Sequence, residues 1–450
     1  MTDIAVVGGG VSGLAAAWEL SAHPDVHVTV VESSNRLGGK IRTEPFVGRE
    51  VDLGPDAFLR RVPDALALCA EIGLDDLIAP AHGTARVYLD GALVPIPTGL
   101  VLGAPAHFDD LDRSTILSAA GLERAHGEAG LAGLPIDEDA AIGGLIRARY
   151  GDEVAERLVG PLLGGIAAGD LDEMSLDACA PQLAAAARQG PSMTAALRSA
   201  LESTTSTAGV EPVFAAPRGG MEVLISTLVE RLRERGVEFR LNTPVDRLPD
   251  ADGVVLSADA ALHAKLLRDR VPEAAQLLSS IEFASVVFTA IAFSADDLPT
   301  DLDASGFLVP RGAGLTVTAA SWSSTKWAHL AGDPAILRVS MGHRHDHRSI
   351  DASDDEVIAT IRRDLNTTMG ITAAPVDVRI ARFRKGFPQY RVGHLELTER
   401  VEQLLATGTP RVALCGMAHR GVGIPACVRE ARRAASGLID RVQNLGHDSR

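Results

Sequence analysis

Three closely spaced glycines near the start of the chain constrain its fold more than any other feature. The motif Gly8-x-Gly10-x-x-Gly13 follows an apolar strand at 4–7 and opens a helix predicted over 12–22. In such a βαβ unit the glycines allow a sharp turn and close packing of the helix on the sheet. The start of the helix then directs N–H groups and its positive dipole end toward a pyrophosphate. We therefore expect a Rossmann-like dinucleotide-binding domain.

The residues after the second strand, 26–31, favour FAD over NAD. Glu32 ends this strand, where an acidic side chain accepts hydrogen bonds from ribose hydroxyls and disfavours a 2′-phosphate. Arg36 is placed to reach phosphate, and Gly38 and Gly39 let the main chain run against a ligand. A plain NAD domain does not need this extension.

Two further segments complete the expected cofactor site. Residues 52–59 supply a tight glycine-proline stretch suited to a ring system. Near the C-terminus, Pro425 lies in the first turn of a helix whose dipole is placed to stabilise the anionic edge of a reduced flavin. The candidate cofactor-binding residues are Gly8, Gly9, Gly10, Val11, Ser12, Gly13, Glu32, Ser33, Arg36, Gly39, Lys40, Gly54, Pro55, Asp56, Ala57, Gly416, Gly423, Ile424 and Pro425.

Composition limits the remaining classes of function. The chain has 450 residues, enough for two or three domains, and a net charge of −16, which argues against a nucleic-acid binder. The four cysteines lack metal-ligand spacing, so we expect reduced thiols in a cytoplasmic protein. We expect no signal peptide, and no apolar run approaches the ~20 residues of a membrane span, although contact with a membrane surface stays open.

The rest of the chain divides by its pattern. A hairpin with a turn at Asp90-Gly91 is expected over 85–95, a largely helical insert over 105–205, and an exposed linker over 202–211. The other predicted elements are helices at 63–80, 221–235, 353–369 and 425–443 and strands at 237–241, 253–257, 283–294, 411–415 and within 306–342.

Several segments, in this order along the chain, resemble one family of flavoenzymes. The chain is similar nearly end to end to the bacterial protoporphyrinogen IX and coproporphyrinogen III oxidases of the flavin amine oxidase superfamily. The segments that carry the resemblance are 54–59, 161–170, 306–309, 322–327, Pro388-Gln389-Tyr390 with Gly393-His394, and 421–425.

The resemblance implies an α/β fold, α+β overall, in which a Rossmann-like FAD-binding domain joins a sheet-based substrate domain and a helical domain. The boundaries it suggests are 1–84, 212–282 and 400–445 for the FAD-binding domain, 85–104 and 283–399 for the substrate domain, and 105–211 for the helical domain. Departures are a loop of only about seven residues, 246–252, where relatives insert a β-hairpin, and Phe383 where relatives often have tryptophan near the flavin.

The implied activity is an FAD- and oxygen-dependent six-electron oxidation of a porphyrinogen in haem biosynthesis, with release of hydrogen peroxide. We expect conversion of coproporphyrinogen III to coproporphyrin III, because the chain resembles the soluble enzymes. Protoporphyrinogen IX as the main substrate is the alternative. The protein would orient substrate and cofactor while the flavin supplies the chemistry.

The resemblance also assigns residues to the substrate. Arg60 and Arg61 lie where a base binds propionate, with Arg61 favoured, and the carbonyl of Gly169 would receive pyrrole N–H groups; Arg61 and Gly169 are the catalytic candidates. Val245 would meet adenine through its backbone, and Phe383 would lie near the flavin. The expected apolar wall residues are Ile166, Phe307 and Trp322, although core packing explains each of them almost as well.

Other interpretations compete with these. His343, His345 and His347 alternate so that all three would face one side of a strand, but the neighbouring charged residues favour a solvated strand end over a metal site. The basic side chains at 382–385 either attract carboxylates or form ordinary surface.

Rival functions are an amine oxidase or carotenoid desaturase on the same scaffold, and a non-catalytic flavin or porphyrin carrier. No cysteine is placed to tether the flavin, so we expect FAD to bind non-covalently. A carrier would hand a tetrapyrrole to a neighbouring enzyme of haem synthesis, and transient contact with such enzymes is a further expectation.

Overall fold

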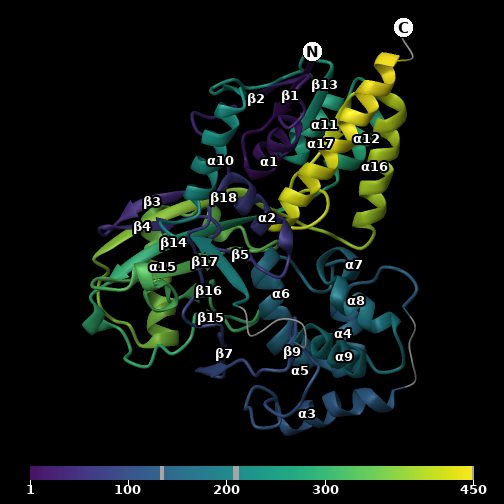
Figure 1. Ribbon diagram of the computed structural model, residues 1–450. Coiled ribbons are helices and arrows are strands. Elements are labelled where there is room, and N and C mark those ends of the chain that lie inside the picture. Colours follow the sequence, from purple (N-terminus) through teal and green to yellow (C-terminus); the bar gives the residue numbers. More distant parts are fainter. Residues whose placement is uncertain (132–135, 206–211, 448–450) are drawn as a thin grey trace.

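A five-stranded parallel sheet forms the first layer of the protein in the computed structural model, which describes residues 1–131, 136–205 and 212–447 (Figure 1). Neighbouring strands pair in parallel throughout, and the centre of the sheet is apolar on both faces, as in other parallel sheets. These five strands confirm the α/β class and the strands predicted for this part of the chain. In spatial order they are β12 (Glu238–Arg240), β2 (Val26–Val31), β1 (Thr2–Val7), β13 (Gly253–Leu256) and β19 (Val412–Leu414).

Helices cover both faces of this sheet. One face packs against α1 (Val11–Leu20), α2 (Pro63–Ile72), α10 (Glu222–Glu234) and α17 (Ile424–His447). The other packs against α11 (Ala260–Leu267), α12 (Pro272–Ser279) and α16 (His394–Gly408).

The helix predicted over 63–80 ends earlier than expected. Gly73 adopts the left-handed conformation (φ 76°) and stops α2 after Ile72. The next apolar residues form β6 (Leu77–Ile78), which pairs with β11 (Phe214–Pro217), and β11 also pairs with β5 (Phe58–Leu59). The helical spacing of the apolar residues therefore continued past the true helix end.

A seven-stranded mixed sheet forms the second layer. Its strands are antiparallel except for one parallel pair. Helix α15 (Asp354–Met369), which begins with a capping box at Ser353, packs on one face of this sheet. The predicted strands, the helix at 353–369 and the hairpin turn at Asp90-Gly91 are confirmed. In spatial order the strands are β18 (Asp377–Pro388), β14 (Phe283–Phe293), β17 (Ala335–Met341), β16 (Val317–Ser321), β15 (Gly306–Leu308), β7 (Arg86–Leu89) and β8 (Ala92–Pro95).

The predicted helical insert folds as helices around its own apolar core, away from the five-stranded sheet (Figure 1). Its last helix reaches Thr205, so the start of the linker predicted over 202–211 is helical instead; residues 206–211 lie outside the described residues. The helices are α3 (Ala119–His126), α4 (Ile142–Tyr150), α5 (Asp152–Val154), a π-helical turn (Ala155–Val159), α6 (Gly160–Ala167), α7 (Leu176–Cys179), α8 (Pro181–Arg188) and α9 (Met193–Thr205).

Short elements fill the connections. Residues 241–252, all of which are described, contain no strand, as the short spacing after Val245 predicted. Among the described residues, no helix has the length and apolar character needed to cross a membrane. The exact boundaries of three domains stay a prediction. The remaining elements are β3 (Thr43–Phe46), β4 (Arg49–Asp52), β9 (Leu100–Val101), β10 (Ala104–Pro105), α13 (Ser323–Lys326), α14 (Arg348–Asp351) and 3₁₀ turns at Gly127–Gly130, Ala295–Asp297 and Ala328–Leu330.

Candidate functional site

The glycine turn between β1 and α1 leaves room for a ligand at the start of the helix. Gly8 has a φ of 109°, and a Cβ atom on Gly13 would lie 1.9 Å from the Gly8 carbonyl oxygen, so glycine is required there. A Cβ on Gly10 would meet nothing closer than 4.0 Å. No side chain caps α1, and its first turn has no acidic residue. The unpaired N–H groups and positive dipole end of α1 are therefore suited to a phosphate.

The Glu32 carboxylate is fixed beside this turn. It accepts hydrogen bonds from the backbone N–H groups of Gly9 and Ser34, both at 2.8 Å, and a weaker one from the Ser33 hydroxyl at 3.3 Å. Partial burial raises the pKa of Glu32, but these hydrogen bonds outweigh it and hold the pKa below its usual value. The side chain is therefore an oriented anion at the end of β2, as ribose recognition requires.

Arg36, predicted to contact phosphate, organises the loop that follows it, and the phosphate contact itself stays a prediction. Its guanidinium donates to three backbone carbonyls of the following loop, those of Leu37 (2.8 Å), Gly39 (2.7 Å) and Ile41 (3.0 Å). The loop in turn reaches the glycine turn, where the Gly38 N–H donates to the Gly9 carbonyl at 2.8 Å. Arg36 thus shapes the loop that lies against the phosphate position. We call residues 8–13 and 32–40 the nucleotide cradle.

The segment 52–57 joins the cradle to the seven-stranded sheet. A Cβ on Gly54 would lie 2.0 Å from the Lys40 carbonyl oxygen, so the two backbones touch. The Asp56 carboxylate lies 2.7 Å from Lys326 Nζ and 3.3 Å from Arg338 Nη1. Burial raises the pKa of Asp56, but these two cations hold it well below its usual value. The Asp56 carboxylate therefore ties this segment to α13 and β17, and its contact with the cofactor stays a prediction.

The start of α17 supplies a second surface for a ligand. Gly416 and Gly423 have φ angles of 112° and 110°, and a Cβ on Gly423 would meet nothing within 4 Å. Ile424 and Pro425 begin the helix and are buried. Lys40 from the cradle reaches the same loop, with Nζ 3.1 Å from Met417 Sδ, and burial lowers its pKa. The cradle and the C-terminal loop are therefore in direct contact.

Gly169 lies in a buried turn after α6. Ala168, before it, has a φ of 49°, and a Cβ on Gly169 would lie 2.8 Å from Met174 Sδ. The Gly169 carbonyl accepts a hydrogen bond from Arg311, whose guanidinium also pairs with Asp170. Sequence reasoning missed Arg311, which comes from a loop 142 residues away and carries no motif of its own.

Two residues predicted to form apolar walls of the substrate site, Phe307 and Trp322, lie in a hydrophobic core instead. Phe307 and Trp322 are 2% and 1% exposed and pack in the core between the seven-stranded sheet and α15. Strand alternation explains the error, because the next residue on β15, Leu308, is the one that approaches α6, 3.5 Å from a Cβ built on Gly165. Ile166, by contrast, is 56% exposed at the end of α6.

The aromatic side chains near Gly169 come from the edge strand β18 and its neighbour β14. Phe288 and Phe383 meet edge to face at 5.8 Å, and Phe387 joins them in a small apolar cluster with Ala168. Phe383 therefore lies in an aromatic group beside the Gly169 turn. Its contact with a flavin stays a prediction.

The remaining predicted residues lie around this region. Arg60 and Arg61 follow β5, where the Arg60 N–H donates to the Val213 carbonyl at 2.9 Å and Arg61 is exposed. Val245 is partly buried, and the Thr243 N–H donates to the Glu32 carbonyl at 2.9 Å, which brings this segment to the cradle. The roles predicted for these residues are compatible with their positions and stay predictions.

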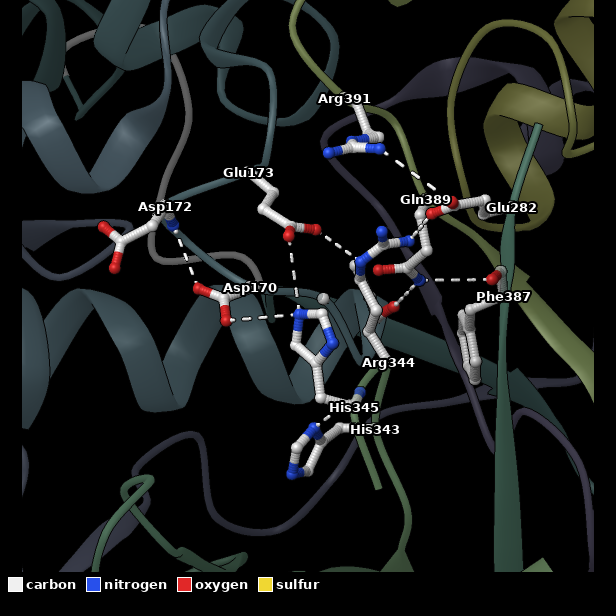
Figure 2. A network of polar contacts seen from close by, with 12 residues as sticks. Asp170, Asp172, Glu173, Glu282, His343, Arg344, His345, Phe387, Gln389 and Arg391 are labelled. Atoms are coloured by element: carbon white, nitrogen blue, oxygen red, sulfur yellow. Dashed lines mark hydrogen bonds and ion pairs between the residues drawn. The ribbon is translucent and has the colours of Figure 1, made fainter. Parts of the chain in front are cut away.

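A polar network connects the Gly169 turn to the seven-stranded sheet (Figure 2). Arg344 pairs with Glu173 and Glu282, and the Arg344 N–H donates to the Ala168 carbonyl at 2.9 Å. His345 Nε2 lies 3.5 Å from Glu173 Oε1 and 3.8 Å from Asp170 Oδ2. The network joins the helical region to the end of β17 and the start of β14.

The histidines at 343, 345 and 347 do not share a strand face. Strand β17 ends at Met341, and Gly342, with a φ of 93°, turns the chain away. Among the described residues, no group of side chains is arranged to hold a metal ion. The cysteines are partly or fully buried, and burial raises the pKa of Cys69 and of Cys179 to about 12, so these thiols are protonated at neutral pH.

Comparisons with known proteins cover nearly the whole chain. Residues 11–439 match the family described as flavin containing amine oxidoreductase. A coproporphyrinogen III oxidase from Propionibacterium freudenreichii subsp. freudenreichii is 34% identical, over 97% of this chain and 90% of that protein. The protoporphyrinogen oxidase of Homo sapiens is 28% identical, over 98% and 99% of the two chains. The crystal structure of a protein from Exiguobacterium sp. 255-15 has a TM-score of 0.86 and 30% identity, over 98% and 99%.

Proposed function

This chain belongs to the flavin containing amine oxidoreductase family, and we propose that it is an FAD- and oxygen-dependent coproporphyrinogen III oxidase. The observation that carries the proposal is the alignment of 97% of the chain with a coproporphyrinogen III oxidase at 34% identity. The reaction removes six electrons and six protons from the porphyrinogen to give coproporphyrin III, and oxygen is reduced to hydrogen peroxide.

The described residues fit an FAD molecule. The turn at 8–13 offers helix N–H groups to the pyrophosphate, and Glu32 offers a fixed carboxylate to the ribose. The open space beside Gly423, at the start of α17, suits the flavin end. The flavin, when bound, supplies the acceptor for the substrate's hydride. We propose non-covalent binding, because burial raises the pKa of Cys415 and Cys427, the thiols nearest this segment, and so disfavours the nucleophilic thiolate.

We assign the substrate to the region of the Gly169 turn. Its buried carbonyl is an acceptor suited to pyrrole N–H groups, and the cluster of Phe288, Phe383 and Phe387 provides apolar surface beside it. Arg311 already donates to this carbonyl and to Asp170, so it is a cation close to where a carboxylate arm of the substrate would lie. Arg60 and Arg61 are further candidates for a propionate.

Anaerobic mixing with coproporphyrinogen III or protoporphyrinogen IX tests the proposal. We expect coproporphyrinogen III to bleach the flavin absorbance and, after oxygen is admitted, porphyrin fluorescence and peroxide to appear in a 1:3 ratio. Flavin that stays oxidised with both substrates would refute the oxidase assignment.

Protoporphyrinogen IX is the second candidate substrate, because the human protoporphyrinogen oxidase aligns with 98% of the chain. The lower identity of 28% makes it the secondary choice. A kcat/KM for protoporphyrinogen IX above that for coproporphyrinogen III would reverse the order.

A further inference from the structure

The segment that leaves strand β18 contacts both halves of the proposed active site. Gln389 and Tyr390 are consecutive and buried, with 6% and 3% of their surface exposed. The Gln389 N–H donates to the Glu282 carbonyl at 2.8 Å, and the Tyr390 carbonyl accepts from the Ser175 N–H at 2.8 Å. Their backbone is therefore anchored to β14 on one side and to the helical region on the other.

The Gln389 side chain holds the turn on the substrate side. Its Nε2 donates to the Ala167 carbonyl at 3.1 Å and to the Phe387 carbonyl at 3.2 Å (Figure 2). Its Oε1 lies 3.2 Å from the position that a Cβ of Gly169 would take. The amide therefore packs on Gly169 while it bonds the residue at the end of α6. Removing the amide nitrogen would free this turn without altering the neighbouring main chain.

The Tyr390 side chain holds the loop on the flavin side. Its hydroxyl donates to the Met417 carbonyl and accepts a hydrogen bond from the Gly421 N–H at 3.0 Å. One oxygen atom thus joins the two ends of the turn at 417–421, directly before the open space at Gly423.

His394 reinforces the same loop. Its ring stacks on the Tyr390 ring at 4.0 Å, and its Nε2 lies 2.7 Å from the His419 carbonyl. Burial lowers the pKa of His394 to about 4, so its imidazole is neutral and donates Nε2–H to that carbonyl. Three carbonyl or N–H groups of the loop, at 417, 419 and 421, are therefore held by two stacked rings.

We propose that Gln389 and Tyr390 are a pair of positioning residues that sets the separation of substrate and cofactor. Gln389 fixes the turn that carries Gly169 on the substrate side, through the Ala167 carbonyl, and Tyr390 fixes the loop at the flavin side. Because the two residues share a peptide bond, the two sides move together. The inference rests on the proposed function for the identity of the ligands, but neither side chain is assigned a contact with them.

The Tyr390→Phe substitution tests the flavin side, with Tyr150→Phe as the matched control. Tyr150 is also buried, and the hydroxyl that this control removes lies 3.1 Å from Thr194 Oγ1 in the helical region. We expect Tyr390→Phe to raise the dissociation constant of FAD about tenfold, or 1.4 kcal/mol, and to shift the visible flavin spectrum. The rate of anaerobic flavin reduction falls, while the KM for porphyrinogen stays within twofold. The control changes none of these.

The Gln389→Met substitution tests the substrate side, with the exposed Gln403→Met as the control. Methionine retains the volume of glutamine but cannot donate to the Ala167 carbonyl. We expect the KM for porphyrinogen and the dissociation constant of coproporphyrin III to rise about tenfold. The flavin spectrum and the FAD dissociation constant stay unchanged, and melting temperatures establish that each variant is folded.

The outcomes separate this inference from the proposed function. If the wild-type protein binds FAD but oxidises neither porphyrinogen, the proposed function fails, and the FAD and porphyrin dissociation constants still decide the positioning. If Tyr390→Phe leaves both FAD binding and the spectrum unchanged, or if Gln389→Met alters only the melting temperature, the positioning role is refuted. A change of the same size in a control variant would refute it as well.

Discussion

The nucleotide cradle and the segment around Gln389 are each held by hydrogen bonds, but these bonds span very different distances along the sequence. In the cradle, the partners are close in sequence: the Glu32 carboxylate accepts a hydrogen bond from the Gly9 N–H, 23 residues away. Around Gln389 the partners are distant, since its amide donates to Ala167 from 222 residues along the chain. The ion pairs of Asp56 with Lys326 and Arg338 are of this second kind. We call these two sets of long-range interactions the inter-region contacts. The phosphate and ribose end of the cofactor site is thus built from residues close in sequence, whereas the flavin end and the substrate side form only when separate regions have packed.

The largest effect is expected in the cradle from Gly13→Ala. The new Cβ would lie 1.9 Å from the Gly8 carbonyl oxygen, so β1 and α1 cannot keep their approach. We expect the protein to purify without flavin, with FAD affinity reduced more than a hundredfold. The absorbance at the flavin band measures this.

Gly144→Ala is the matched control for that substitution. It lies in α4, where an added Cβ meets nothing within 4 Å, and alanine is the better helix former. Full flavin content is expected. Normal flavin binding by Gly13→Ala would show that the close approach at Gly8 is not needed.

The next effect is expected in the inter-region contacts from Asp56→Asn. Lys326 and Arg338 are only 15% and 12% exposed, so loss of their shared anion leaves two nearly buried cations unpaired. The free energy of unfolding should fall by about 2–4 kcal/mol. Chemical denaturation measures it, and Asp351→Asn, which breaks the exposed pair with Arg384, should leave it unchanged. Equal losses in the two variants would contradict the distinction between inter-region and surface pairs.

A smaller effect with a definite sign is expected from Asp52→Asn. Burial raises the pKa of Asp52 from 3.8 to about 6, so the folded protein favours the protonated acid. The folded protein therefore loses stability as the pH rises from about 4 to about 6, and the loss is complete above about pH 6. Asparagine keeps an Oδ1 acceptor for the Thr43 hydroxyl and the Met221 N–H but cannot ionise.

The difference between variant and wild type should appear in melting temperature measured across pH. We expect the variant to gain on the order of 1–3 kcal/mol relative to wild type between pH 4 and pH 7. A constant difference across this range would show that Asp52 does not titrate there.

The smallest effect is expected from Arg36→Lys, again in the cradle. A single ammonium cannot reach the three carbonyls that the guanidinium holds. FAD should bind about fivefold more weakly, with little change in melting temperature, and titration of the apoprotein measures this. Arg384→Lys, on an exposed pair with Asp351, is the control. A hundredfold loss would instead indicate direct contact with phosphate.

The errors of sequence interpretation follow from the same contrast. Helix α2 was expected to run past Gly73 because apolar spacing alone does not reveal a left-handed helix end. Phe307 was expected on the substrate side, but a shift of one residue along β15 exchanges the two faces of the sheet. Trp322 follows β16 and packs in the same core. The histidines at 343, 345 and 347 were expected on one side of a strand, but the strand ends at Met341 and the chain turns at Gly342. The partners of Arg36 and Asp56 could not be inferred from residue type.

The spacing of Gly8, Gly10, Gly13 and Glu32 was enough to predict the glycine turn, the start of α1 and the acid at the end of β2, because these residues lie within one local unit. The order of strands and helices was likewise predicted from their periodicity. By contrast, the contact of Arg311 with Gly169, and the contacts of Gln389 and Tyr390 on opposite sides of the site, follow from long-range packing. The first two contacts join residues 142 and 222 positions apart, and the Tyr390 contact joins residues 31 positions apart in different loops, so no local spacing predicts them. Their geometry depends on how whole sheets and helices pack.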